Sequence, residues 1–148
     1  MGHLTTRLPR DLEVAGQMLT TRKWWDESRS RFELYTSEAT VVEASRGDRE
    51  AAKSRLDAII GITLLPVSRD VFALTQLLLS SNALPAKARM DAFHVAIAAT
   101  NSVEFLLTWN CKHLANAILR TKIEQACTDQ GFKAPIICTP VELQEVYP

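Results

Sequence analysis

Apolar residues along the chain gather into four short runs, and longer segments with a helical repeat of apolar and polar positions separate them. The runs predict strands at residues 32–35, 62–65, 105–109 and 135–138. The first run is the weakest of the four. The last three are continuous rather than alternating, which is typical of strands that are covered on both faces.

A helical pattern follows each run. Polar positions recur between residues 69 and 80 with apolar turns between them, which predicts an amphipathic helix. Residues 139–142 read Thr-Pro-Val-Glu, a capping box with proline at the first helical position. Helical segments also fit residues 11–31, 38–44, 48–60, 86–100 and 115–130.

Strands that alternate with helices indicate an α/β sandwich with a largely parallel sheet. Ligands of such sheets bind beyond the carboxyl ends of the strands. The residues to inspect are therefore the polar side chains that follow the predicted strands, namely Ser37, Ser68, Asp70, Thr108, Asn110 and Thr139.

The composition is that of an ordinary globular chain, and it excludes a disordered one. The sequence has 148 residues, of which 47% are hydrophobic and 23% are charged. A chain of this length predicts one domain over residues 1–148. No run is long enough to span a membrane and no signal peptide stands out, so we expect a cytoplasmic protein without membrane contact.

Charge and cysteine content narrow the classes of function further. The 17 basic and 17 acidic residues give zero net charge, so a nucleic acid would have to be held by a local patch or by metal ions. Three cysteines without the spacing of a disulfide framework indicate a reducing compartment. The spacing of Cys111, His113, Cys127 and Cys138 does not match a tetrahedral zinc site. The sequence also lacks a glycine-rich phosphate loop and a nucleophile elbow.

Asp91 opens the segment 91–99, which is apolar almost all round and is expected to be a buried helix. Its carboxylate either compensates the helix dipole or serves as a functional acid, and composition alone favours the dipole role. His94 lies on the same face, either as a metal ligand or acid–base group or as a histidine hydrogen-bonded in the core. Glu43 with Arg46 fits an ordinary surface ion pair.

Thr108 and Asn110 end the strongest strand pattern. A hydroxyl and a carbonyl oxygen at a strand terminus can coordinate a hard cation or position a water. Alternatively, Asn110 caps the helix that follows, a role for which asparagine is well suited. The residues alone leave both roles open.

Two neighbouring motifs carry a resemblance to a known family. Residues 91–98 read Asp-Ala-Phe-His-Val-Ala-Ile-Ala, and residues 105–116 read Phe-Leu-Leu-Thr-Trp-Asn-Cys-Lys-His-Leu-Ala-Asn. Together they resemble the C-terminal half of a PIN domain, a small α/β nuclease fold that includes the VapC-type toxins of bacterial toxin–antitoxin pairs. Residues 34–43 are similar to that family's second strand and acidic helix, and residues 135–143 to its last strand and helix. The resemblance covers nearly the whole chain.

The resemblance implies a three-layer α/β/α sandwich with a mainly parallel sheet, and a metal-dependent ribonuclease. The family holds Mg²⁺ or Mn²⁺ with acidic residues at the C-terminal edge of the sheet, where the ions activate a water and neutralise charge on the phosphate. The resemblance places Glu43 and Asp91 at the positions of the family's metal-binding acids. Asn110 stands where many PIN domains have another Asp, with Thr108 beside it. The implied partners are an RNA substrate, an antitoxin-like protein and a second copy in a homodimer.

The N-terminus departs from the family pattern. PIN domains begin with a central strand that ends in an Asp, whereas residues 2–10 resemble the segment just after that strand. Only Met1 precedes them, so we expect the strand and its Asp to be missing. Two carboxylates and the neutral Asn110 would then bind a divalent cation weakly. The missing strand would also leave two unpaired inner edges that invite strand exchange or aggregation.

The sequence thus predicts a single PIN-like domain of the VapC type whose ribonuclease activity is impaired by the missing Asp. Two alternatives stay open. The first is a non-catalytic PIN-like module that binds an antitoxin-like partner or itself. The second is an unrelated α/β domain in which Asp91 and Asn110 serve only as helix caps.

Overall fold

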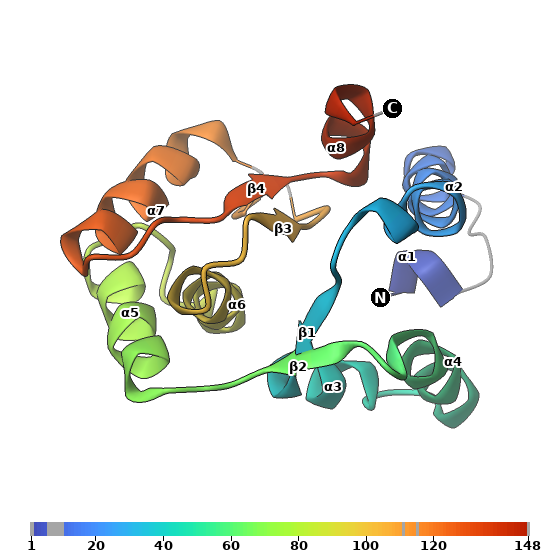
Figure 1. Cartoon of the computed structure of the whole chain (residues 1–148), viewed down its shortest axis with the longest axis horizontal. Coiled ribbons are helices and arrows are strands. Elements are labelled where there is room, and N and C mark those ends of the chain that lie inside the picture. The colour runs from blue at the N-terminus through green and yellow to red at the C-terminus, as the bar shows by residue number, and fades with distance from the viewer. Residues whose placement is uncertain (1, 6–10, 111, 115, 148) are drawn as a thin grey trace. The chain divides into compact units, whose positions relative to one another are not determined.

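Most of the described residues are helical, and short parallel strands alternate with the helices. The computed structural model describes residues 2–5, 11–110, 112–114 and 116–147 (Figure 1). In chain order, its elements are α1 (Gly2–Thr5), α2 (Leu12–Glu27), the 3₁₀ turn η1 (Arg29–Arg31), β1 (Tyr35–Ser37), α3 (Glu38–Ala44), α4 (Arg49–Ile59), β2 (Thr63–Leu65), α5 (Arg69–Ser80), α6 (Arg89–Thr100), β3 (Phe105–Leu107), α7 (Ala117–Asp129), β4 (Ile136–Cys138) and α8 (Pro140–Val146).

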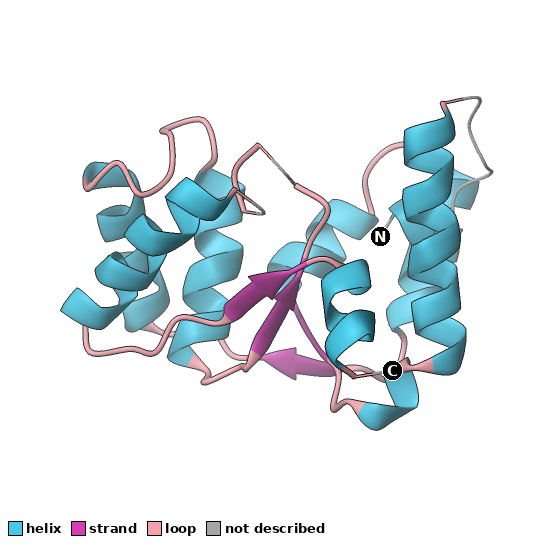
Figure 2. Ribbon diagram, turned by 90° about the horizontal axis from the view of Figure 1, so that it is seen from above, coloured by secondary structure: helices cyan, strands magenta, loops and turns pink. Residues whose placement is uncertain are grey.

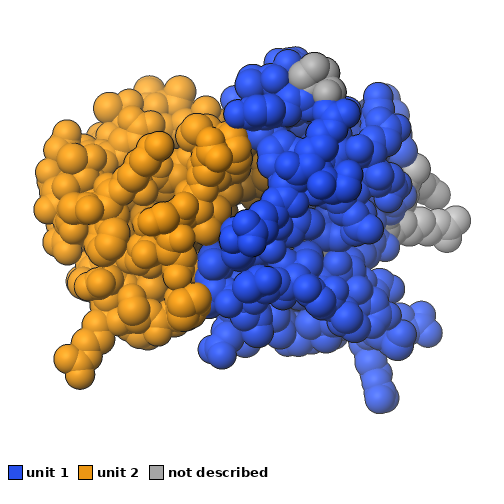
Figure 3. All heavy atoms as spheres, in the orientation of Figure 1, with its two compact units in different colours: residues 1–65, 140–148 blue, residues 66–139 orange. Residues whose placement is uncertain are grey.

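The chain divides into two compact units, which are coloured separately in Figure 3. The first unit consists of Met1–Leu65 and Pro140–Pro148, and the second consists of Pro66–Thr139. The described residues of each unit form helices and one parallel sheet of two short strands (Figure 2). The fold is therefore of the mixed α/β class. The single domain over residues 1–148 stays a prediction.

In the first unit, β1 pairs with β2 in parallel, with Tyr35 opposite Thr63 and Ser37 opposite Leu65. A parallel pair needs a long crossover between its strands, and α3 and α4 supply it. Ser37 ends β1 and also begins α3, because its hydroxyl accepts a hydrogen bond from the backbone N–H of Thr40 (3.2 Å).

An aromatic cluster connects α2 to the C-terminal residues of the first unit. Trp24 is 4% exposed, and its ring centroid lies 5.8 Å from that of Phe32. Phe32 in turn meets Tyr147 edge to face, with centroids 5.9 Å apart. Beside this cluster, Arg31 donates a hydrogen bond to the backbone oxygen of Tyr147 (3.4 Å). These contacts hold the two separate chain segments of the unit together.

In the second unit, β3 pairs with β4 in parallel, with Phe105 opposite Ile136 and Leu107 opposite Cys138. The crossover between them is α7, whose first backbone N–H groups are capped by the side chain of Asn116. The helix α6 is the core of this unit and packs against α5 and β3. Its buried side chains are small or β-branched, namely Ala92, Val95, Ala96, Ile97, Ala98 and Ala99.

Most predicted elements are present, and their ends show where the sequence pattern misleads. The helices predicted at residues 38–44 and 69–80 are confirmed with those bounds as α3 and α5. The strand predicted at residues 32–35 is wrong over most of its length, because Phe32 packs in the aromatic cluster and β1 begins only at Tyr35. The predicted burial on both faces is also wrong for two strands, because Leu64 of β2 is 53% exposed and Ile136 of β4 is 51% exposed.

Among the helices of the described ranges, none is long and apolar enough to cross a bilayer. Of the N-terminal segment that resembles the start of the family pattern, residues 2–5 form α1, and residues 6–10 lie outside the described residues.

Two isoleucines on α7 give a matched test of the second unit's core. Ile123 is fully buried, whereas Ile118 is 75% exposed on the same helix. Replacing Ile123 with Ala is expected to lower the free energy of unfolding by about 2–5 kcal/mol, because the lost methyl groups leave a cavity. Replacing Ile118 with Ala is expected to change it by less than about 0.5 kcal/mol. Urea denaturation followed by circular dichroism measures both. Equal losses would contradict the assignment of this core.

Candidate functional site

The first turn of α6 and the loop after β3 lie at the same end of the second unit, because the chain reverses direction between them. At about 1.5 Å per residue, α6 advances about 14 Å from Asp91 to Thr100. At about 3.3 Å per extended residue, the chain returns about 13 Å from Glu104 to Thr108. A short turn joins the two segments, and α6 packs against β3. Residues just after β3 therefore lie beside Asp91.

One carboxylate oxygen of Asp91 binds two side chains of that loop. The Nδ2 group of Asn110 donates to Asp91 Oδ2 at 2.9 Å. The Nδ1 atom of His113 lies 2.8 Å from the same oxygen. Since an ionised carboxylate only accepts hydrogen bonds, Nδ1 of His113 is the donor. The side chains of His113 and Asp91 are 19% and 21% exposed, so the ion pair or charge-assisted hydrogen bond is only weakly screened by solvent.

The orientation of the Asn110 amide follows from its other contacts. Its Oδ1 accepts a hydrogen bond from the backbone N–H of His113 at 3.2 Å, so its NH₂ group must face Asp91. Thr108 fixes the same residue from the other side, because its Oγ1 accepts from the backbone N–H of Asn110 at 3.0 Å. Asn110 is therefore held at three points.

The predicted roles as helix caps do not describe this geometry. The side chain of Asp91 bonds to Asn110 and His113 and makes no hydrogen bond to the backbone of its own helix. Asn110 closes a turn at residues 112–114, whereas α7 begins later and is capped by Asn116. We name the four residues that these bonds join, Asp91, Thr108, Asn110 and His113, the Asp91 cluster.

His113 is the member of this cluster that sequence reasoning missed, since it was weighed only as a zinc ligand. A signal for it exists. An Asn that follows a strand often bonds the backbone N–H three residues further on, and this bond brings the third residue back toward the strand end. Asn110 makes that bond, and the side chain of His113 consequently reaches Asp91.

The remaining predicted residues lie elsewhere. Glu43 occupies the last turn of α3, is exposed and belongs to the first unit, whereas Asp91 belongs to the second. The pairing of Glu43 with Asp91 around a metal therefore stays a prediction. His94 lies one turn after Asp91 on α6 and does not take part in the hydrogen bonds that join the cluster.

The oxygens of the Asp91 cluster are of the type that hard cations prefer, but hydrogen bonds already use most of them. Asp91 Oδ2 accepts two, and Oδ1 of Asn110 accepts one. Oδ1 of Asp91 keeps its lone pairs and Oδ1 of Asn110 keeps one of two, so the role of Asn110 as a cation ligand stays a prediction. Within the described residues, no three His, Cys, Asp or Glu side chains come together as a metal-binding group.

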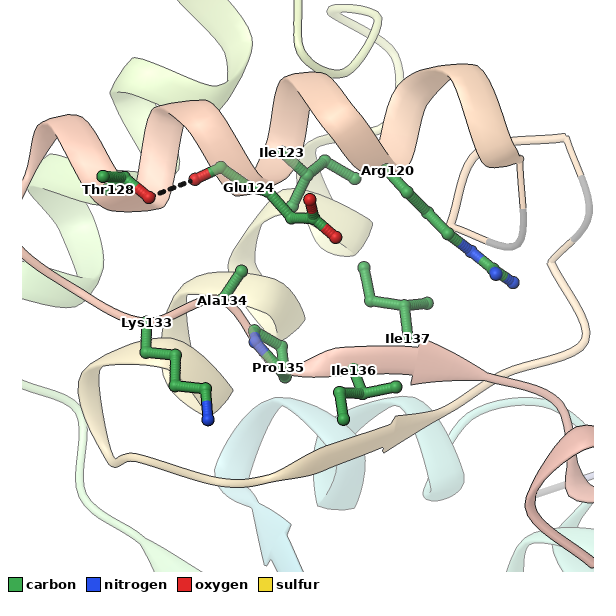
Figure 4. Close-up of a pocket in the computed structure, with 9 residues that line it drawn as sticks. All are labelled: Arg120, Ile123, Glu124, Thr128, Lys133, Ala134, Pro135, Ile136 and Ile137. Carbon is green, nitrogen blue, oxygen red and sulfur yellow. Dashed lines mark hydrogen bonds between the residues drawn. The ribbon is translucent and has the colours of Figure 1, made fainter. Parts of the chain in front are cut away.

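A shallow hollow of about 420 Å³ lies between α7 and β4 of the second unit (Figure 4). Arg120, Glu124 and Lys133 contribute its charged groups, and none of the predicted site residues lines it. Cys127, also on α7, is fully buried. Burial, and to a smaller extent the charge of Glu124, raises the pKa of its thiol to about 11, which favours the protonated thiol at neutral pH.

No protein-family model matches the sequence, and no curated protein or solved structure is significantly similar to it.

The Asp91 cluster predicts a loss of stability that is specific to Asp91. Replacing Asp91 with Ala leaves the donors of Asn110 and His113 without an acceptor, so the free energy of unfolding is expected to fall by about 1–3 kcal/mol. Asp70, in the first turn of α5, is the matched control because it offers the same dipole compensation without a cluster. Its replacement with Ala is expected to cost less than about 1 kcal/mol. Urea denaturation of both variants measures the difference. Similar losses of stability in both variants would mean that Asp91 contributes only through its interaction with the helix dipole.

Proposed function

We propose that this chain is a PIN-like domain of the VapC toxin type, a ribonuclease that depends on Mg²⁺ or Mn²⁺ and whose activity is impaired. The observation that carries the proposal is the hydrogen bond between Asp91 and Asn110 (2.9 Å). It joins the two motifs on which the family resemblance depends, one on α6 and one after β3. The same contact supports a shared role for the two residues at the carboxyl end of a parallel strand.

The proposed architecture is a three-layer α/β/α sandwich with a mainly parallel sheet. Two features support it. Both sheets are parallel, and a helical crossover joins the strands of each. Polar residues also stand at the carboxyl ends of the strands, Ser37 as the last residue of β1 and Thr108 directly after β3, where ligand sites lie in this class of fold.

A divalent cation at this site would activate a water and neutralise charge on a phosphodiester. The chain would contribute Asp91 through its Oδ1 atom, with Glu43 as the second acid. Thr108 and Asn110 position the loop next to Asp91 through their hydrogen bonds. Two carboxylates give a weaker electrostatic attraction for a divalent cation than the larger acidic set of the family, which is the basis of the proposed impairment.

The second candidate is a non-catalytic PIN-like module that binds an antitoxin-like partner or a second copy of itself. The saturation of Asp91 Oδ2 favours it, because His113 and Asn110 already satisfy the hydrogen-bonding capacity of this oxygen without a metal. Exposed apolar side chains such as Phe72, which is 61% exposed and contacts Phe93 at 5.7 Å, are consistent with a protein partner.

Manganese binding separates the two candidates without knowledge of the RNA. If the metal site forms, Mn²⁺ at 100 times its Kd is expected to stabilise the chain by about 2.7 kcal/mol, which a thermal-shift titration detects. The shift is expected to disappear with EDTA and in Asp91→Asn, and to persist in Asp70→Asn, which removes an equivalent charge outside the cluster. Cleavage of a labelled RNA in Mn²⁺ is expected to follow the same pattern at a low rate.

The opposite result has an equally definite meaning. No stabilisation at millimolar Mn²⁺ together with no cleavage would contradict the ribonuclease proposal and leave the binding module. A shift of the same size in Asp91→Asn would mean that the cation binds elsewhere on the chain.

A further inference from the structure

We propose that the hollow between α7 and β4 binds an extended acidic peptide, which pairs with the outer edge of β4 as an added strand. The hollow belongs to the second unit, and none of the residues that line it is a member of the Asp91 cluster. The proposal is therefore independent of the ribonuclease. The shape of the hollow, the backbone beside it and the charges at its ends all point to such an occupant.

The hollow is a groove that runs lengthwise along β4. Five consecutive residues, 133–137, line one side of it, and residues between Arg120 and Thr128 of α7 line the other (Figure 4). The two segments are about 13 Å and about 12 Å long, at ~3.3 Å per extended residue and ~1.5 Å per helical residue. Because consecutive side chains of a strand point to opposite faces, a hollow that touches five residues in a row follows the edge of the strand.

The backbone at this edge is unpaired. Towards β3, the N–H of Ile136 donates to the C=O of Glu104 at 2.7 Å, and the C=O of Cys138 accepts from the N–H of Thr108 at 3.0 Å. Ile137 lies between these two residues, so its N–H and C=O point to the opposite edge of β4. Neither group bonds to another described residue, although Ile137 is only 5% exposed. Buried backbone groups cost free energy without a partner, and an added strand would supply one.

The side chains around the groove favour an acidic peptide. Lys133 and Arg120 lie at its two ends, and Glu124 is the one acidic residue among those that line it (Figure 4). Ile136, which is 51% exposed, offers an apolar contact beside the edge. Pro135 contributes a C=O but no N–H, which limits pairing to a short segment. An acidic residue at each end of an extended apolar segment would complement this arrangement.

A titration with defined peptides tests the proposal. The probe is a pool of pentapeptides with blocked ends, with aspartate at the first and last positions and valine, isoleucine, threonine or tyrosine between them. In ¹⁵N–¹H correlation spectra, the amide resonance of Ile137 is expected to shift as its N–H gains an acceptor. Lys133→Glu is expected to raise the apparent Kd about tenfold. Lys122→Glu reverses an exposed charge of α7 outside the groove and is expected to leave the Kd unchanged.

Three results would overturn the proposal. An unchanged Ile137 resonance at millimolar peptide would exclude the added strand. An unchanged Kd in Lys133→Glu, or an equal Kd for a pool with lysine at both ends, would exclude recognition of acidic residues. A shift of the Ile137 resonance with protein concentration, without peptide, would assign the edge to a second copy of the chain. Circular dichroism checks the folding of Lys133→Glu, and should it fail to fold, the lysine pool on the natural chain decides.

Discussion

The carboxylate of Asp91 is the constraint on which the candidate site depends. A single oxygen accepts hydrogen bonds from Asn110 and His113, which belong to the loop after β3, whereas Asp91 belongs to α6. A half-buried polar group without a hydrogen-bond partner lowers the stability of the fold. These three side chains therefore satisfy their hydrogen bonds only together. The conformation of the loop therefore follows from the position of this oxygen.

That position is in turn set by the apolar packing of α6. Four of its six buried residues are alanines, and such small side chains allow α5 and β3 to approach the helix closely. Asp91 is thus fixed by a rigid core, whereas its partners are fixed by polar contacts at the surface.

The sequence predicts those parts of the fold whose pattern is local. The amphipathic repeat of α5 and the bounds of α3 are both readable from neighbouring residues, and both are confirmed. The strand expected around Phe32 is wrong because this ring packs against Tyr147, far away in the sequence. No local pattern contains such a contact. Side-chain exposure of β2 is unpredictable for the same reason, since it depends on which strand receives the covering helix.

The candidate site also has a part that the sequence predicts and a part that it does not. The family resemblance implies that Asp91, Asn110 and Thr108 lie in one site, and the described geometry brings these three residues together. The direction of the Asn110 amide and the presence of His113 depend on one turn hydrogen bond, which composition and spacing do not specify.

The aromatic cluster of the first unit has a consequence for the order in which the chain folds. Arg31 and Tyr147, which meet beside this cluster, are 116 residues apart, and the whole second unit lies between them. A ribosome releases the second unit before it releases Tyr147, so the second unit is free to fold while the first is incomplete. Closing so long a loop also costs entropy and slows the step. The edge-to-face contact of Phe32 thus forms only after Tyr147 has left the ribosome.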